Sequence, residues 1–404
     1  MTEGTATTAR PAVERQPDAG GRLAGLDGLR GIASLVVVLH HAALLIPWWP
    51  GNTSASSLPV GSVGWWLNVT PLKLATAGEE AVMVFFVLSG LVVTLPVLRA
   101  KSFDWVAYFP RRLARLLLPV LGSVVLAAFW VMLLQQVSPQ AEHSWVTSSS
   151  TPNLSWEQVV LAGDVFGGDG QINNPLWTLR WESLFSLTLP AIVALAAVFA
   201  RRWVLAVVGV VVLTWLGIRT GAGSAHHLPA FVLGALLAMR LDDLRRFRNR
   251  LSASRWGPAA GAGIAVAGAL LLIASWLAAP LLPGNVELGR ALQSLTPIGA
   301  ALLIISALCW SGLDTALRTR PVQFLGRISF SLYLVHVPIV LFCFYALGGY
   351  SLPLAQLVAI LLSLVVATAF WRLFERRTHQ WSRTIGAAAS ARVAAVRAAR
   401  GLES

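Results

Sequence analysis

An arginine and a histidine stand eleven residues apart in the largely apolar stretch LDGLRGIASLVVVLHHA, residues 26–42. In an α-helix this spacing exceeds three full turns by about 20°, so Arg30 and His41 share one helix face, about 16 Å apart along the axis. His40 points about 100° away from that face. Because a neutral imidazole can accept a proton near neutral pH, His41 is the first candidate for acid–base chemistry.

A membrane setting sharpens this expectation, because ionisable groups inside a bilayer are costly and usually functional. We expect Arg30 at the cytoplasmic boundary, His41 near the middle of the membrane or slightly beyond, and Asp27 as the helix N-cap. The alternative is structural: Arg30 anchors the helix by snorkelling, and His41 is a hydrogen-bonded packing residue.

Two further polar side chains interrupt apolar segments. Glu182 lies in NPLWTLRWESLFSLTLP, residues 174–190, and an unpaired carboxylate there is expensive. It needs a histidine or arginine from another helix, and it is either a site residue or half of a Glu–Arg packing clamp. His336 precedes Pro338, which loosens the local helical hydrogen bonds. It lines the site or binds a polar substrate group, unless it is only a hydrogen-bonded packing residue.

Two more segments have both a functional and a structural interpretation. Arg111, Arg112 and Arg115 lie in YFPRRLARLLLP, where they can hold phosphates or only mark the cytoplasmic side. Ser89 and Gly90 lie in GEEAVMVFFVLSGLVV. They favour close helix approach, with room for a thin acyl chain as the alternative.

These residues need a membrane bundle to position them. The 404 residues are 56% hydrophobic and 12% charged, and apolar segments of membrane-spanning length recur along the chain. The pattern predicts an all-α polytopic bundle of about ten transmembrane helices. Their expected spans are 29–47, 79–98, 116–137, 176–200, 203–218, 228–240, 258–282, 291–310, 327–347 and 353–374.

The basic residues predict the orientation. With the N-terminus inside and the helices alternating, all but four of the 31 Lys and Arg residues fall on the cytoplasmic side. Both termini are therefore expected in the cytoplasm. We expect a disordered N-terminal tail over 1–25, a transmembrane domain over 26–376, and a basic C-terminal tail over 377–404 that can lie on anionic lipid. The long segments 48–78 and 138–175 then face outside.

Several classes of protein are excluded. The net charge of +13 comes from short basic runs between apolar segments, so we expect a lipid bilayer and not nucleic acid as the partner. Cys309 and Cys343 lie in apolar segments and are expected to be buried packing residues. The sequence shows no zinc or haem spacing, Walker loop or Rossmann fingerprint, and we expect no metal site.

The motifs, taken in order, resemble the acyltransferase-3 family of integral membrane O-acyltransferases. LDGLRGIASLVVVLHHA resembles the family's opening helix, with Arg30 and His41 at its arginine and histidine. Similar elements are GEEAVMVFFVLSG, YFPRRLARLLLP, NPLWTLRWESLFSL with Glu182, ISFSLYLVHVP with His336, and LFERRTHQW with Glu375. Departures are Thr178 in place of serine, Ser186 in place of a frequent tyrosine, and Arg376 and Arg377 where proline often follows the closing glutamate.

The resemblance implies transfer of an acyl group, often acetyl, from an acyl-CoA donor to a hydroxyl of a sugar, glycolipid, cell-wall polymer or macrolide-like product. It implies a multi-pass plasma membrane protein with acyl-CoA as donor substrate and no permanently bound cofactor. His41 would be the general base, and Glu182 would orient or polarise a site group through His336. The donor phosphates would bind Arg30 with Arg111, Arg112 and Arg115.

Two alternatives remain open from the sequence. Intramembrane His, Glu and Arg also occur in proton-coupled transporters, although no paired repeat or matched broken helix is visible here. The second alternative is a relay that passes acyl groups to a separate enzyme.

Overall fold

The computed structural model describes residues 23–52, 57–134, 136, 144–167, 170, 172–281 and 284–400. Within these ranges the chain forms helices and no β-strand. Eight helical segments are long and apolar enough to cross a membrane: Ala24–Ala43 (α1), Gly78–Arg99 (α3), Trp105–Leu133 (α4), Asn174–Phe199 (η3 and α7), Trp203–Thr220 (α8), Val286–Cys309 (α13 and α14), Arg320–Leu347 (α16) and Leu352–Ala399 (α17, η4 and α18).

Two shorter apolar helices, Gly223–Met239 (α9) and Gly257–Leu272 (α11), complete the set. The all-α polytopic bundle is thus confirmed, with eight long helices and two short ones at the ten predicted positions. The connecting helices are Val63–Val69 (α2), Pro71–Thr76 (η2), Ser144–Ser149 (α5), Trp156–Gly163 (α6), Leu241–Ala253 (α10), Ala274–Ala278 (α12) and Ser311–Leu317 (α15).

Helix α1 begins and ends earlier than its apolar run predicts. The N-cap is Leu23, so the prediction of Asp27 as N-cap is wrong, and Asp27 lies in the first turn. A carboxylate there still interacts favourably with the positive end of the helix dipole, which favours the earlier start. His40 and His41 consequently lie in the last turn of α1, closer to its end than expected.

Helix α4 starts eleven residues before the predicted position 116. Asp104 caps it by accepting a 2.9 Å hydrogen bond from the amide of Ala107. The three arginines therefore lie on the helix itself. The predicted spans 258–282 and 291–310 are each interrupted, at Ile273 and at Ser294–Leu295.

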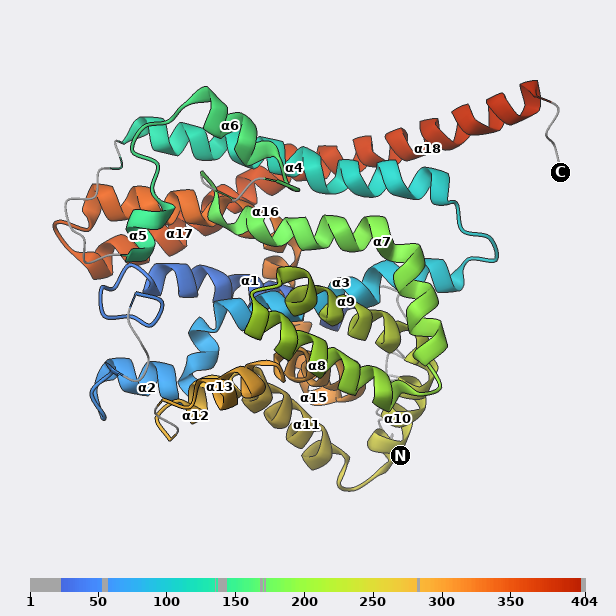
Figure 1. Cartoon of the computed structure of the whole chain (residues 1–404), viewed down its shortest axis with the longest axis horizontal. Helices are drawn as coiled ribbons and strands as arrows, with labels where there is room; N and C mark the ends of the chain where they lie inside the picture. Colours follow the sequence, from blue (N-terminus) through green and yellow to red (C-terminus); the bar gives the residue numbers. More distant parts are fainter. Residues whose placement is uncertain are drawn as a thin grey trace, which may run out of the picture.

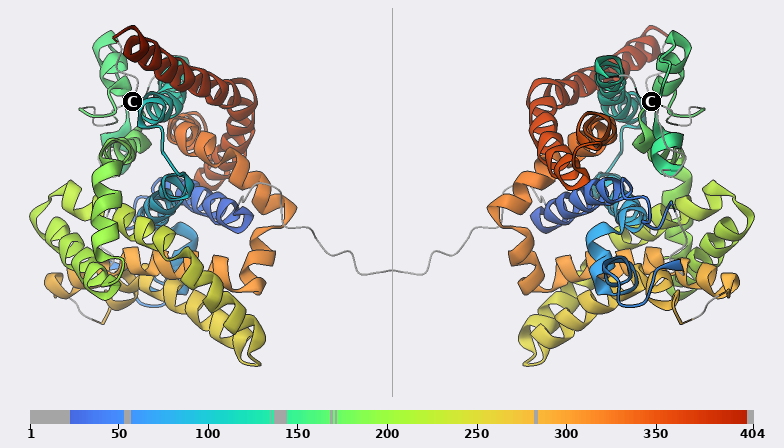
Figure 2. Two further views of the ribbon diagram at one scale, coloured as in Figure 1. Left: turned by 90° about the vertical axis from the view of Figure 1, so that its right-hand side faces the viewer. Right: turned by 90° about the vertical axis from the view of Figure 1, so that its left-hand side faces the viewer.

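The long helices run side by side, and the short ones gather at their ends (Figure 1). Helices α2, α5, α12 and α13 lie toward one end of the bundle, while α10 and the last turns of α18 lie toward the other. Seen along the bundle, α1 lies in the interior, between the helices near the C-terminus and the yellow α10 and α11 (Figure 2). The predicted outer segments thus share one end, and the basic α10 lies at the other.

Small residues let the central helices approach closely. A Cβ atom built on Gly31 of α1 would lie 2.4 Å from the backbone nitrogen of Gly326 on α16. A Cβ on Gly90 of α3 would lie 2.2 Å from the carbonyl oxygen of Phe231 on α9, so the packing interpretation of Gly90 is confirmed. Cys309 and Cys343 are buried and free, as predicted.

An asparagine repairs the hydrogen bond that Pro338 removes from α16. Proline has no amide hydrogen, so the carbonyl of Leu334 loses its helical donor. The side-chain amide of Asn173, just before η3, donates to that carbonyl at 2.8 Å. The carbonyl is thus satisfied by a neighbouring segment, as a proline-containing helix in a membrane requires, and the start of α7 is tied to α16.

The predicted C-terminal tail continues the last helix. Residues Arg376–Ala399 form α18, which packs along α4. Ser390 donates a 2.7 Å hydrogen bond to Asp104. Contact of this helix with anionic lipid stays a prediction, and the expected N-terminal tail lies, as far as residue 22, outside the described residues.

Candidate active site

Two histidines from α1 and α16 meet inside the bundle. The Nδ1 atom of His41 lies 3.1 Å from the Nε2 atom of His336, and their ring centroids are 4.9 Å apart. His336 is fully buried, whereas His41 is partly exposed. Arg30 on α1 also reaches α16, where its Nε donates to the hydroxyl of Ser329 at 3.0 Å. Both side chains therefore reach the same neighbouring helix, as their shared helix face predicts.

Backbone carbonyls define the tautomers of the neutral pair. The Nδ1 atom of His336 lies 3.0 and 2.9 Å from the carbonyl oxygens of Leu332 and Tyr333. A carbonyl only accepts, so this nitrogen carries the proton and Nε2 of His336 is an acceptor. The Nδ1 atom of His41, 2.9 Å from the carbonyl of Val37, then carries its own proton. The lone pair of His41 is left on Nε2.

His40 turns to another part of the structure. Its Nδ1 atom lies 2.9 Å from the carbonyl oxygen of Thr76 at the end of η2. Its ring also occupies the space that a side chain at Gly78 would need. Of the adjacent histidines, His41 is therefore the one that faces His336.

Glu182 finds an arginine partner on another helix. It forms an ion pair with Arg112 of α4, in which the two side chains are 14% and 13% exposed. The hydroxyl of Ser89 on α3 donates to the same carboxylate, and Arg112 also donates to Ser186 at 3.0 Å. The expectation of an arginine from another helix is confirmed. The described contacts join Glu182 to this cluster, not to His336.

A second carboxylate lies near Arg30. Glu375 is 4% exposed and accepts a hydrogen bond from Ser331 of α16. It interacts electrostatically with Arg30 and Arg115, and His379 lies 3.6 Å away. The site therefore contains two groups of charges, one around Glu182 and one around Glu375, and Arg115 interacts electrostatically with both carboxylates.

The three arginines of α4 have different surroundings. Arg112 pairs with Glu182, Arg115 belongs to the group around Glu375, and Arg111 is exposed beside Gly386 of α18. Arg112 points about 100° away from Arg111, whereas Arg115 lies within one turn of both on the same side of the helix. Arg115 interacts electrostatically with both Arg112 and Arg30, so it links the two groups of charges.

The sequence predictions did not assign Glu375 to the site. A π-helical turn, Trp371–Glu375, interrupts the long last helix and ends at this residue. Such turns are frequent at functional sites. The sequence carried two signals for it: a lone glutamate at the end of an apolar segment, and the resemblance of LFERRTHQW to the family's closing element.

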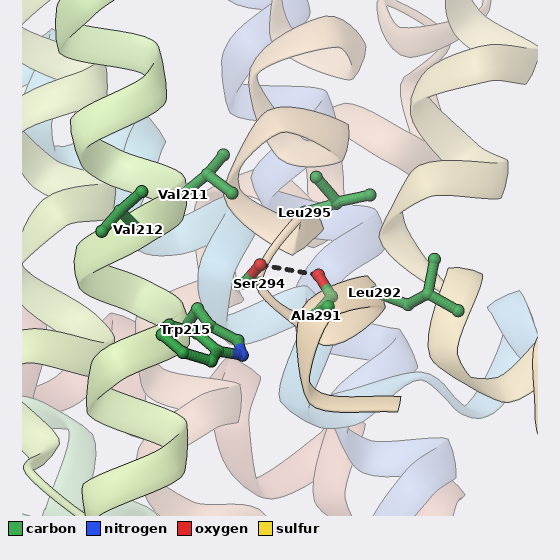
Figure 3. Close-up of a pocket in the computed structure, with 7 residues that line it drawn as sticks. All are labelled: Val211, Val212, Trp215, Ala291, Leu292, Ser294 and Leu295. Atoms are coloured by element: carbon green, nitrogen blue, oxygen red, sulfur yellow. Dashed lines mark hydrogen bonds between the residues drawn. The ribbon is translucent and has the colours of Figure 1, made fainter. Parts of the chain in front are cut away.

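Two apolar hollows lie away from these groups of charges. One, of about 450 Å³, is lined by Val211, Val212, Trp215, Ala291, Leu292, Ser294 and Leu295. Figure 3 shows Val211 and Trp215 on the side of α8 that faces the α13–α14 segment. None of the predicted site residues lines it, and its apolar surface suits lipid or a neighbouring helix better than a charged donor.

The geometry can be compared with known proteins. The model of the acyltransferase-3 family, described as an acyltransferase domain, matches residues 23–372. The chain belongs to this family. As a family member it is an acyltransferase, and its apolar helices are those of a multi-pass membrane protein. No solved structure matches the chain.

Three curated relatives are similar to it. Acyltransferase MdmB of Streptomyces mycarofaciens is 30% identical over 347 residues, which cover 81% of each chain. O-acetyltransferase PaAT-1 of Phomopsis amygdali is 28% identical, with 80% of this chain and 73% of the relative covered. The putative peptidoglycan O-acetyltransferase YrhL of Bacillus subtilis (strain 168) is 25% identical, with 78% of this chain and 48% of the relative covered.

Proposed function

We propose that this acyltransferase moves an acetyl group from acetyl-CoA to a hydroxyl of a sugar, glycolipid, cell-wall polymer or macrolide-like natural product at the plasma membrane. The observation that carries the proposal is the His41–His336 contact at 3.1 Å, which leaves the lone pair of His41 on Nε2. Two relatives are named as O-acetyltransferases, which supports oxygen as the acceptor atom and acetyl as the group.

The proposed reaction uses His41 twice. Its Nε2 atom takes the proton of the acceptor hydroxyl while the oxygen attacks the thioester carbonyl carbon. The tetrahedral intermediate collapses, the carbon–sulfur bond breaks, and the CoA thiolate takes the proton back from His41. His336 acts as a positioning residue, because its protonated Nδ1 fixes which nitrogen of His41 is basic.

The arginines supply the donor side of the proposal. Arg30 lies eleven residues before His41 on α1, a rise of about 16 Å, and Arg115 belongs to the same charged group. A guanidinium pair binds phosphate through several donors. The CoA head would stay near Arg30 and Arg115 while its pantetheine arm carries the thioester toward His41.

The test is a comparison of cells with and without the gene by mass spectrometry of glycans and secreted metabolites. Cells with the gene are expected to contain glycans or metabolites whose mass is larger by an acetyl group, and the deletion strain should lack these species. His41→Ala should abolish this acetyl increment while the protein still inserts in the membrane. His40→Gln is the matched control, because His40 bonds to Thr76 instead, and it should retain the increment.

Three outcomes would contradict the proposal. Normal acetylation by His41→Ala removes this residue from the chemistry. Purified protein that moves a solute across vesicle membranes and leaves labelled acetyl-CoA intact would be a carrier. A stable acetyl–protein adduct that forms without acetylated product would indicate a relay.

A further inference from the structure

A tryptophan from the predicted outer segment covers His41. Trp145 of α5 places its ring 5.4 Å from the imidazole of His41, with 47° between the ring planes. The indole is half-buried. It belongs to segment 138–175, far from α1 in sequence, so the contact results from tertiary structure.

An asparagine holds this tryptophan in place. The side-chain oxygen of Asn52 accepts a 2.9 Å hydrogen bond from the backbone amide of Trp145. Its nitrogen donates to the carbonyls of Leu44 and Ile46, at 2.9 and 3.0 Å. These carbonyls directly follow the turn that carries His41. Asn52 therefore ties the backbone of Trp145 to the end of α1.

The other end of α5 is fixed as well. Val146 is fully buried. The hydroxyl of Ser150 donates to the carbonyl of Val146 and lies 2.7 Å from the hydroxyl of Tyr345 on α16. Trp145 is thus anchored to both helices that supply the histidine pair, which is the rigid support that a substrate-orienting side chain needs.

We infer that Trp145 is a specificity-determining residue that stacks on the apolar face of a hydroxylated ring, such as a sugar, and directs one hydroxyl of that ring to His41. The inference rests on the proposed function. Aromatic side chains with few polar groups beside them are usual in small-molecule sites.

The position of Trp145 assigns it to the acceptor and not to the donor. The donor phosphates are proposed at Arg30, eleven residues before His41, so the CoA arm reaches His41 from that direction. Trp145 arrives from the opposite end of α1, on α5, which lies at the same end of the bundle as α2 (Figure 1). The acceptor would then enter from the end of the bundle that holds these segments.

The test measures initial rates with the purified full chain in lipid nanodiscs and labelled acetyl-CoA. The acceptor probes are p-nitrophenyl β-glucoside, a hydroxylated ring, and 1-octanol, a hydroxyl without a ring. The unmodified protein should prefer the glucoside. Trp145→Ala should raise the KM for the glucoside about tenfold and leave the KM for acetyl-CoA unchanged. Trp145→Phe should restore most of the loss, and Asn52→Ala should act in the same direction as Trp145→Ala.

Trp156 provides the matched control. It lies in α6 of the same outer segment and is 79% exposed, so Trp156→Ala should leave both KM values unchanged. Circular dichroism and elution volume should show that each variant folds.

Several outcomes would overturn the inference. They are a preference for 1-octanol, an unchanged KM for the glucoside in Trp145→Ala, and a raised KM for acetyl-CoA alone. If Trp145→Ala gains transfer from butyryl-CoA while its KM for the glucoside is unchanged, Trp145 contacts the acyl group of the donor and not the acceptor. Protein that cleaves no acetyl-CoA with either probe contradicts the proposed function as well, whereas glucoside acetylation that is insensitive to Trp145→Ala contradicts this inference alone.

Discussion

The Nδ1 atom of His41 lies 3.1 Å from the Nε2 atom of His336, across the contact between α1 and α16. These helices approach closely because Gly31 faces Gly326. The two imidazoles form a chain in which backbone carbonyls set the proton on His336, and the Val37 carbonyl together with Nε2 of His336 sets the proton on His41. The pair therefore has one basic nitrogen to offer, Nε2 of His41.

This chain predicts unequal effects of the two histidines. His41→Ala removes the base and should lower kcat by about 100-fold or more. His336→Phe leaves the base but removes the ring nitrogen that accepts the hydrogen bond from Nδ1 of His41. The kcat should therefore fall less, about 10-fold, with little change in the KM for acetyl-CoA. The double variant should be no slower than His41→Ala, because residues that act as a unit are not additive.

Initial rates with labelled acetyl-CoA check this order. His226→Phe is a suitable control, since His226 stacks on His227 in α9. A double variant much slower than His41→Ala would mean that His336 has a chemical role of its own.

The Arg112–Glu182 pair predicts an effect on stability. Glu182→Ala leaves Arg112, whose side chain is 13% exposed, without its counterion, which should cost about 3–5 kcal/mol. Replacing both residues by Met and Leu should recover most of the loss. Thermal unfolding in detergent measures the differences.

An exposed pair serves as the comparison. The Arg245 and Asp242 side chains are 64% and 77% exposed, so Asp242→Ala should change the free energy of unfolding by less than about 1 kcal/mol. Equal losses in Glu182→Ala and Asp242→Ala would show that the buried pair is not special.

The helical periodicity of single segments was predictable from the sequence. The apolar runs gave the ten helix positions, and the eleven-residue spacing gave the shared face of Arg30 and His41. Contacts between helices were less predictable from the sequence. Glu182 needed an arginine or a histidine, but only the packing of α4 against α7 shows that the partner is Arg112.

Helix ends and local irregularities were also missed. Nothing in the apolar pattern separates a start at Ala24 from one at position 29, because Asp27 suits both an N-cap and a first turn. The π-helical turn that ends at Glu375 contacts α16 through Ser331, and the sequence of the segment alone does not contain this contact.

Asn173 provides a third prediction. Its amide donates to the Leu334 carbonyl that Pro338 leaves without a donor. Asn173→Leu should therefore lower the free energy of unfolding by about 1–3 kcal/mol. Adding Pro338→Ala restores the amide hydrogen in α16, so the double variant should unfold at a higher temperature than Asn173→Leu. If Pro338→Ala gives no rescue, the Leu334 carbonyl is not the cause of the loss.

Lys73 in η2 is a buried cation at the end of the bundle that holds α2 and α12. Its side chain is 1% exposed. Its Nζ lies 3.6 Å above the ring of Trp276 and 3.2 Å from the side-chain oxygen of Asn68. Burial lowers the pKa of Lys73 from 10.5 to about 8, against the opposing charges of Glu80 and Glu79.

A lowered lysine pKa makes stability depend on alkaline pH. Below about pH 8 the folded protein holds the buried charge and its cost is fully present. Between about pH 8 and 10.5 the folded Lys73 is neutral while the unfolded chain still binds the proton. Unfolding then takes up a proton, so the free energy of unfolding rises with pH over this window. Lys73→Met lacks this rise, and the unfolding temperature of the unmodified protein minus that of Lys73→Met should increase from pH 7.5 to 10. A constant or falling difference would show that Lys73 keeps its proton in the fold.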